Sequence, residues 1–136
     1  VVNAQPAVFA RNELIEIDGR QVNLRLVQNP TSFQLNVDEL TKANSPLMLM
    51  AGSDIHDPSW LWTVDFTALE KVDIVSGSNA YDLALRLSYA GVDVGSVVTD
   101  LSEAKNTFLN LEGQLPTILF SADSMRRLRR LTGLAK

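Results

Sequence analysis

VDIVSGSNAYDLALRLSYAG, residues 72–91, contains the clearest structural signal in this chain. It begins with VDIVSG (72–77), an apolar run that ends in small residues, as in a strand covered on both faces. Residues 79–90 then have the apolar spacing of a helix, and Gly91 follows where a helix needs a C-terminal cap. A strand followed directly by a helix is the repeating unit of α/β proteins. The residues on the apolar side of this helix are Ala80, Leu83, Ala84, Leu87 and Ala90.

Strands and helices also alternate on both sides of this unit. Short apolar runs predict further strands at 47–51, 92–98 and 116–121. Apolar spacings of three and four residues predict three more helices. The first follows Asn29-Pro30 and has Phe33, Val37 and Leu40 on one face; the second is capped by Asp100 with Glu103 and reaches about Leu111; the last turns Met125, Leu128 and Leu131 inward.

The stretch LIEIDGRQVNLRLV (14–27) predicts an antiparallel hairpin. Two alternating apolar runs flank Asp18-Gly19, a dipeptide that favours the positive φ angles of a tight hairpin turn. The expected fold class is therefore α/β, with a mostly parallel Rossmann-like sheet, helices on both faces, right-handed crossovers and this N-terminal hairpin at one edge.

Length and composition limit the class of protein. The chain has 136 residues and a mass of 15.0 kDa, which fits a single domain spanning residues 1–136. A net charge of −4 argues against nucleic acid as a partner. With no cysteine, the chain has no thiol nucleophile or thiolate metal ligand. No apolar run approaches the ~20 residues of a transmembrane helix. The chain does not begin with Met, so we expect a piece of a longer protein.

The segment SDIHDPSWLWTVDF (53–66) concentrates unusual chemistry. It follows the predicted strand 47–51 directly, so Asp54, His56 and Asp57 should lie at the carboxyl ends of the parallel strands, where α/β proteins bind ligands. An equally good interpretation is an acidic loop in which Asp57 begins a turn and helix cap. A lone histidine without a second ligand of matching spacing predicts no metal site, and we expect none.

Both tryptophans, Trp60 and Trp62, also lie in this segment. Burial in the core is favoured over presentation to a partner, because large aromatic side chains contribute so much buried area.

The turn SGSN (76–79) precedes the helix 79–90. Ser76, Gly77 and Asn79 are candidates for binding a phosphate or carboxylate at the N-terminus of that helix. The chain contains no GxxxxGK[ST] motif. A basic cluster in the last predicted helix is favoured as a solvated helix face over a phosphate-binding patch; its members are Arg126, Arg127, Arg129 and Arg130.

Three of these stretches together resemble the C-terminal domain of MurT-type Mur ligases. They are LVQNPTSF, DIHDPSWLWTVDF and SGSNAYDLALRLSYAG, which span most of the chain from Val22 to Gly91. The family patterns that they resemble are LVKNPxGF, DGxDVSWLWDVDFE and SGxRAxDxALRLKYAG. The chain departs from these patterns at several positions, among them Gln28, Ile55, Thr63 and Asn79.

The resemblance implies a function. MurT-type proteins are the ligase subunits of lipid II isoglutaminyl synthase, which amidates the D-glutamate of the peptidoglycan stem peptide with ATP and glutamine-derived ammonia. It implies a glutaminase partner with a Cys-His active site, to which Asp57, or Asp54 as second choice, lends a carboxylate. ATP and Mg would be bound mainly by a domain outside this chain, none tightly by the chain itself, which would be inactive alone. The expected location is the cytoplasm, at the inner face of the membrane.

A different class of function also fits the residues. The chain could be a stand-alone α/β module that binds a small anionic ligand at the carboxyl edge of its sheet and catalyses nothing. An upstream GxxxxGK[ST] motif and a neighbouring gene for a Cys-His glutaminase would argue against that alternative.

Overall fold

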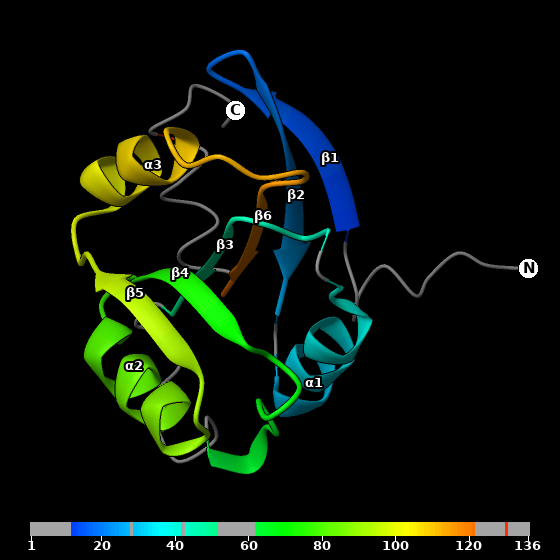
Figure 1. Cartoon of the computed structure of the whole chain (residues 1–136), viewed down its shortest axis with the longest axis vertical. Helices are drawn as coiled ribbons and strands as arrows, with labels where there is room; N and C mark the ends of the chain where they lie inside the picture. Colours follow the sequence, from blue (N-terminus) through cyan, green and yellow to red (C-terminus); the bar gives the residue numbers. More distant parts are fainter. Residues whose placement is uncertain (1–11, 28, 42, 52–61, 122–129, 131–136) are drawn as a thin grey trace, which may run out of the picture.

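A computed structural model describes residues 12–27, 29–41, 43–51, 62–121 and 130 of the chain (Figure 1). Within these residues the chain forms six strands and three helices. In order they are β1 (Asn12–Ile17), β2 (Arg20–Leu26), α1 (Pro30–Glu39), β3 (Leu47–Met50), β4 (Lys71–Ser76), α2 (Ala80–Tyr89), β5 (Asp93–Val97), α3 (Leu101–Leu109) and β6 (Thr117–Phe120).

The strands form one sheet in the order β1-β2-β6-β3-β4-β5. β1 pairs with β2 in antiparallel orientation, and all other neighbouring strands are parallel. β6 comes last along the chain but lies between β2 and β3. The predicted α/β class is therefore confirmed: the sheet is mostly parallel, with an antiparallel hairpin at one edge.

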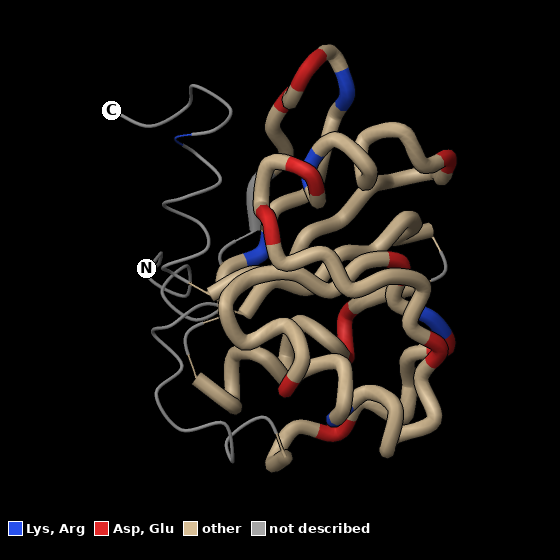
Figure 2. The backbone as a smooth tube through the Cα atoms, turned by 90° about the vertical axis from the view of Figure 1, so that its left-hand side faces the viewer, with Lys and Arg blue, Asp and Glu red and all other residues tan. Residues whose placement is uncertain are grey.

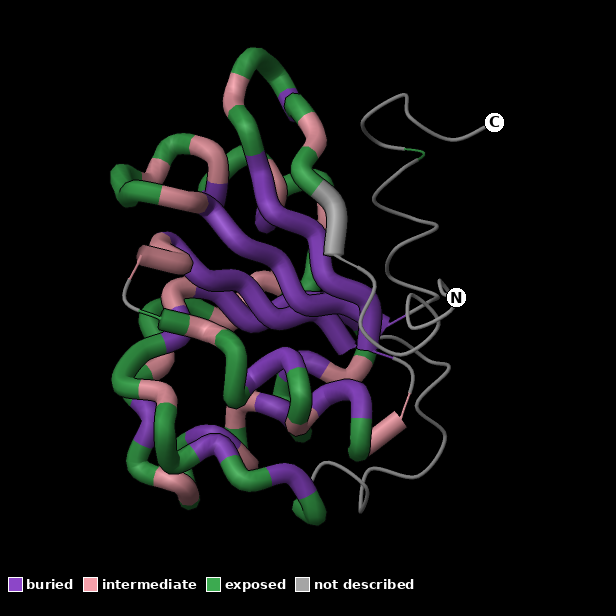
Figure 3. Tube along the Cα trace, turned by 90° about the vertical axis from the view of Figure 1, so that its right-hand side faces the viewer, coloured by how far each residue is buried: buried purple, intermediate pink, exposed green. Residues whose placement is uncertain are grey.

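The helices lie on both faces of the sheet. α1 and α2 cover one face, and their core residues include Phe33 and Leu83. α3 covers the other face through Ala104 and Phe108. The chain advances from β2 to β5 with its helices on the first face and returns to β6 with α3 on the second. Crossovers between parallel strands are right-handed, so a connection that runs back along the sheet places its helix on the opposite face. The central strands β3 and β6 are wholly buried, and β2 and β4 are mostly buried, whereas the edge strand β5 has no buried residue (Figure 3).

The hairpin forms where the sequence predicts it. Asp18 and Gly19 have φ angles of 51° and 85°, as the tight turn requires. The hairpin is attached to α3 by two side chains. Lys105 Nζ lies 3.1 Å from an Asp18 carboxylate oxygen, and Arg20 donates to the carbonyl oxygens of Leu109, at 2.8 Å, and Leu111.

The helix caps explain where the helices begin and end. Asn29 and Ser32 form a reciprocal capping box at the start of α1, and Pro30 occupies its first position. Asp100 accepts from the Ser102 amide, which confirms the predicted cap of α3. The prediction that this helix reaches about Leu111 was wrong. α3 ends at Leu109, where the next amides bond three residues back and the guanidinium of Arg20 takes up terminal carbonyls.

α2 also matches its prediction closely. Ala80, Leu83 and Leu87 are buried, and Gly91 has a φ of 82° just after the helix. The predicted last helix, with Met125, Leu128 and Leu131, lies outside the described residues, as do Arg126, Arg127 and Arg129. Arg130 is helical and exposed.

Candidate functional site

Ala51, at the carboxyl end of β3, is held against the turn that follows β4. The Ala51 amide donates to the carbonyl oxygen of Ser76 at 3.0 Å, and the Ala51 carbonyl accepts from the Asn79 amide at 2.9 Å. Gly77 has a φ of 98°, and a Cβ at this position would clash with the Ala51 carbonyl. Only glycine allows the two strand ends to approach this closely. Ala51, the last described residue before the segment 52–61, is therefore fixed beside the N-terminus of α2.

The residues of greatest interest in that segment lie outside the described residues. These are Asp54, His56, Asp57 and Trp60. The roles expected for Asp57 and Asp54 stay predictions. The structure does describe the residues on either side of it, Ala51 and Trp62.

The residues that follow the segment, from Trp62 to Phe66, are attached to α2 by Arg86. The guanidinium of Arg86 donates to the carbonyl oxygen of Val64 at 2.6 Å. It also lies 5.2 Å from the ring centroid of Trp62 and 5.4 Å from that of Phe66, within cation-π range. Val64 and Phe66 are 1% and 0% exposed. One side chain of α2 therefore connects a buried backbone carbonyl and two rings of the motif WTVDF.

The residues after the segment are also attached to α1, by Gln34. Its side-chain amide accepts from the Asp65 amide at 2.7 Å and donates to the Asp65 carbonyl at 3.0 Å, as a neighbouring strand would. Phe33 packs edge-on against Phe66, with the ring centroids 5.2 Å apart. Residues 64–66 thus lie between the two helices of one sheet face. No sequence pattern singles out Gln34 or Arg86, although Arg86 belongs to the stretch ALRL within a matched motif.

Trp62 corrects a prediction. Its side chain is 46% exposed and stacks at 5.2 Å against Tyr89 of α2, so its predicted burial in the core was wrong. Trp62 and Thr63 are in a short 3₁₀ turn, and after it Val64 and Phe66 occupy the core positions. The indole is left on the surface beside α2.

The titration of Asp65 is displaced by its hydrogen bonds. Hydrogen bonds from the Thr67 side chain and the Thr67 amide lower the pKa of Asp65 from its ordinary value of 3.8, and the nearby charge of Arg86 acts in the same direction. The Thr67 hydroxyl lies 2.6 Å from the Asp65 carboxylate and the amide 2.9 Å. The carboxylate is therefore held ionised as the local cap of the turn 65–67.

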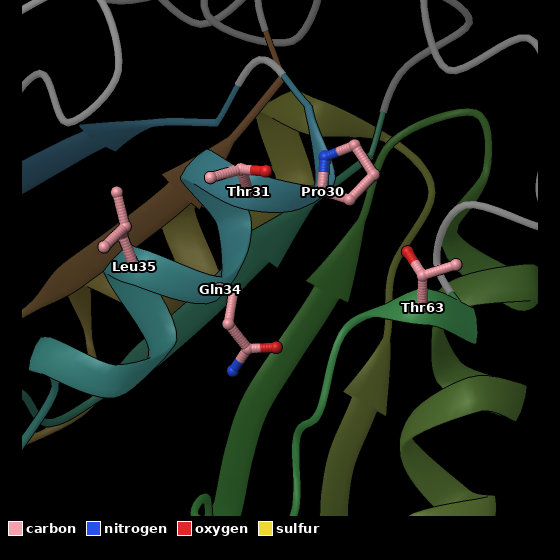
Figure 4. A pocket seen from close by; sticks show the side chains of 5 residues that line it. All are labelled: Pro30, Thr31, Gln34, Leu35 and Thr63. Carbon is pink, nitrogen blue, oxygen red and sulfur yellow. The ribbon is translucent and has the colours of Figure 1, made fainter.

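A shallow hollow of about 390 Å³ lies between the first turn of α1 and the turn at Thr63 (Figure 4). Its lining contains no charged side chain. It has no group for acid-base chemistry, although it lies next to one end of the segment 52–61. The lining residues are Pro30, Thr31, Gln34, Leu35 and Thr63.

The turn 76–79 contains the three candidate anion-binding residues Ser76, Gly77 and Asn79, and some of its polar groups are already used in hydrogen bonds. Ser76 is fully buried, and its hydroxyl has no hydrogen-bond partner among the residues that the structure describes. The Asn79 amide is already used by Ala51, the Ala80 amide donates to Gly77, and Asp82 places a carboxylate in the first turn of α2. A second anion at this helix terminus would meet that carboxylate at close range. The hydroxyl of Ser76 is the better-placed group for a ligand.

Within the described residues, no three His, Asp or Glu side chains come close enough to hold a metal ion. The same part of the chain contains no helix with the length and hydropathy needed to cross a bilayer.

Comparison of the sequence with known proteins gives two matches. The family model described as "MurT ligase C-terminal" matches residues 26–121, from the end of β2 to the residue after β6. The chain is also 26% identical over 136 residues to a protein of Streptococcus pneumoniae (strain ATCC BAA-255 / R6), named lipid II isoglutaminyl synthase (glutamine-hydrolyzing) subunit MurT. That match covers 92% of this chain and 30% of the relative's length. The chain belongs to the MurT ligase C-terminal family.

Proposed function

We propose that this chain is the C-terminal domain of the ligase subunit of a lipid II isoglutaminyl synthase. The family match across residues 26–121 carries the proposal, because it spans strands β3 to β6 and all three helices of the sheet's two faces. The reaction is the amidation of the D-glutamate of the lipid II stem peptide, with ATP as the energy source and glutamine as the ammonia source. The name of the Streptococcus pneumoniae relative supports the glutamine-hydrolysing class.

The domain docks a separate glutaminase subunit and lends it a carboxylate. A Cys-His glutaminase needs a third group that orients its histidine and stabilises the imidazolium. Asp57 is the proposed group, with Asp54 as second choice. The chain has no cysteine and cannot supply the thiol. The support for this role is positional. Ala51, directly before the segment that contains both aspartates, lies at the carboxyl edge of the sheet. The residues after that segment are attached to α2 through the bond from Arg86 to the Val64 carbonyl.

The chain has no phosphate-binding GxxxxGK[ST] loop, and the described residues hold no acidic cluster for a cation. We therefore assign ATP and Mg chiefly to the remainder of the ligase. Ser76, Gly77 and Asn79 are proposed to face the ligand side of that site, with the Ser76 hydroxyl as the contacting group. Lipid II would place the enzyme at the cytoplasmic face of the membrane.

A stand-alone module for a small anion is the competing function. The carboxylate of Asp82 in the first turn of α2 would repel an anion at that terminus in either function, so the family match is what favours the ligase.

Reconstitution separates the two functions. The full-length ligase with its glutaminase should form amidated lipid II in the presence of ATP and glutamine. Asp57→Asn should depress glutamine hydrolysis by the complex by about a hundredfold or more, because the imidazolium loses its counter-charge, while docking stays intact. Normal turnover in Asp57→Asn would remove the catalytic role of this residue. Failure of the wild-type ligase to bind or activate any glutaminase would remove the proposed function itself.

A further inference from the structure

The outer face of α2 presents an unusual set of exposed side chains. Tyr81, Leu85 and Tyr89 recur every four residues, and they are 69%, 53% and 72% exposed. Positions four apart lie one above the other on a helix, so the three form a continuous row. Trp62, 46% exposed, stacks on Tyr89 and extends this row sideways. We call these four residues the α2 aromatic face.

Its composition is that of a protein-protein contact surface. Tyrosine and tryptophan dominate the energetic centres of interfaces, because each combines a large apolar area with a polar group that tolerates water in the free subunit. Three of the four residues in the α2 aromatic face are of these types. Two other exposed leucines among the described residues, Leu14 on β1 and Leu35 on α1, belong to different elements.

The charges around the face distinguish a protein partner from a membrane surface. Asp82 lies in the adjacent helical row, and Asp65 lies near Arg86 on the same side of the domain. Asp and Glu residues are prominent on the side of the molecule that contains α2 and α3 (Figure 2). The guanidinium of Arg86 is already engaged by the Val64 carbonyl. Anionic lipids attract surfaces rich in Lys and Arg, so this face, on a chain of net charge −4, suits a protein with a basic rim instead.

The face is also continuous with the proposed glutaminase site. α2 contacts the residues that flank the segment 52–61: the Ala51 carbonyl accepts from the Asn79 amide at the N-terminus of the helix, and Trp62 packs on Tyr89 at its C-terminal end. A partner that receives a group from this segment therefore has α2 within its contact area.

We propose that the α2 aromatic face is the docking surface for the glutaminase subunit. This inference rests on the proposed function and adds to it the residues that bind the partner. The glutaminase covers Tyr81, Leu85 and Tyr89, encloses the exposed part of Trp62 and places basic side chains opposite Asp65 and Asp82.

Binding of full-length ligase variants to the purified glutaminase, measured by titration calorimetry, tests the surface. Leu85→Ser and the double variant Tyr81→Ala/Tyr89→Ala should each weaken binding about tenfold or more, as loss of central interface residues does. Leu14→Ser is the matched control, since Leu14 is 59% exposed on a distant strand, and its Kd should stay within about twofold. Asp82→Lys should slow association, and more so at low salt.

Each outcome decides a separate point. If the Leu85→Ser protein remains folded and binds the glutaminase as tightly as Leu14→Ser, the docking surface is elsewhere, and the inference fails while the proposed function stands. If wild-type ligase binds no glutaminase, the proposed function and the inference fail together. Vesicles of phosphatidylglycerol that contain lipid II provide the third arm. Loss of vesicle binding by Leu85→Ser, with glutaminase binding unchanged, would make this a membrane surface and overturn the inference.

Discussion

Replacing Arg86 by Met should destabilise this domain far more than the loss of an ordinary surface arginine. Methionine keeps an unbranched side chain over the ring of Phe66 but removes the guanidinium. The Val64 carbonyl then loses the donor that lies 2.6 Å away, and Trp62 loses the cation over its ring. Val64 is 1% exposed, so its carbonyl is poorly placed to gain water in exchange.

The structure sets the size of the effect. A hydrogen bond with a charged donor contributes about 1.5–3 kcal/mol, and a cation-π contact at a partly exposed ring about 0.5–1 kcal/mol. Losing the bond and the contact with the Trp62 ring should cost about 2–4 kcal/mol. With an unfolding entropy of about 2.1 cal/mol/K per residue, each kcal/mol lowers the Tm of a chain of 136 residues by about 3.5 °C. The melting temperature should therefore fall by about 7–14 °C.

Urea unfolding and calorimetry of the purified chain measure this loss directly. Lys71→Met is the matched control, because Lys71 is 58% exposed and pairs with Asp73 at 3.3 Å on the surface, where an ion pair contributes at most about 1 kcal/mol. Arg86→Lys should lie between the two, since it keeps the charge but loses the planar donor. A cost below about 0.5 kcal/mol for Arg86→Met, equal to that of Lys71→Met, would refute the idea that Arg86 anchors residues 62–66.

Three further predictions follow from the site. Ser76→Ala should raise the melting temperature, because it removes a buried hydroxyl that has no partner among the described residues, and such a group costs about 1–3 kcal/mol. If that hydroxyl contacts a ligand, the same substitution should raise the KM of the full ligase, and an unchanged KM would assign it no ligand role. Asp65→Asn should lower the Tm at neutral pH and have less effect as the pH falls below the ordinary value of 3.8, because a carboxylate with a lowered pKa contributes stability above its unfolded pKa and loses it on protonation; an equal difference at neutral pH and at pH about 3 would contradict this. The purified chain alone should unfold cooperatively. It should show neither glutamine hydrolysis nor ATP-dependent amidation, because it has no thiol and no GxxxxGK[ST] loop. Either activity, measured without any partner protein, would argue against the assignment.

Local sequence determined most of the elements of this fold. Asp18-Gly19 specifies the hairpin, because few other residue pairs adopt two positive φ angles in succession without strain. The spacing of Ala80, Leu83 and Leu87 specifies α2, and Asp100 specifies the start of α3. These signals act over a few residues and depend on backbone geometry and side-chain hydrogen bonds that are local. The class of fold follows from them once strands and helices alternate.

Tertiary structure alone decided the arrangement of those elements. The buried strands β3, β4 and β6 have similar apolar sequences, so nothing local distinguishes the central position of β6 between β2 and β3 from a place at an edge. Strand order is decided by long-range backbone pairing and by the helices that must cover both faces.

The candidate site divides in the same way. The sequence placed the segment 52–61 after β3 and therefore at the carboxyl edge. It could not show that Trp62 lies on the surface, because alternation along an extended stretch assigns residues to two faces but does not tell which face is buried. That choice depends on Val64 and Phe66 filling the space between α1 and α2, and on Arg86 and Gln34 bonding the backbone there from helices far away in sequence. Contacts between such distant residues exist only after the sheet has brought the two helices to the same face.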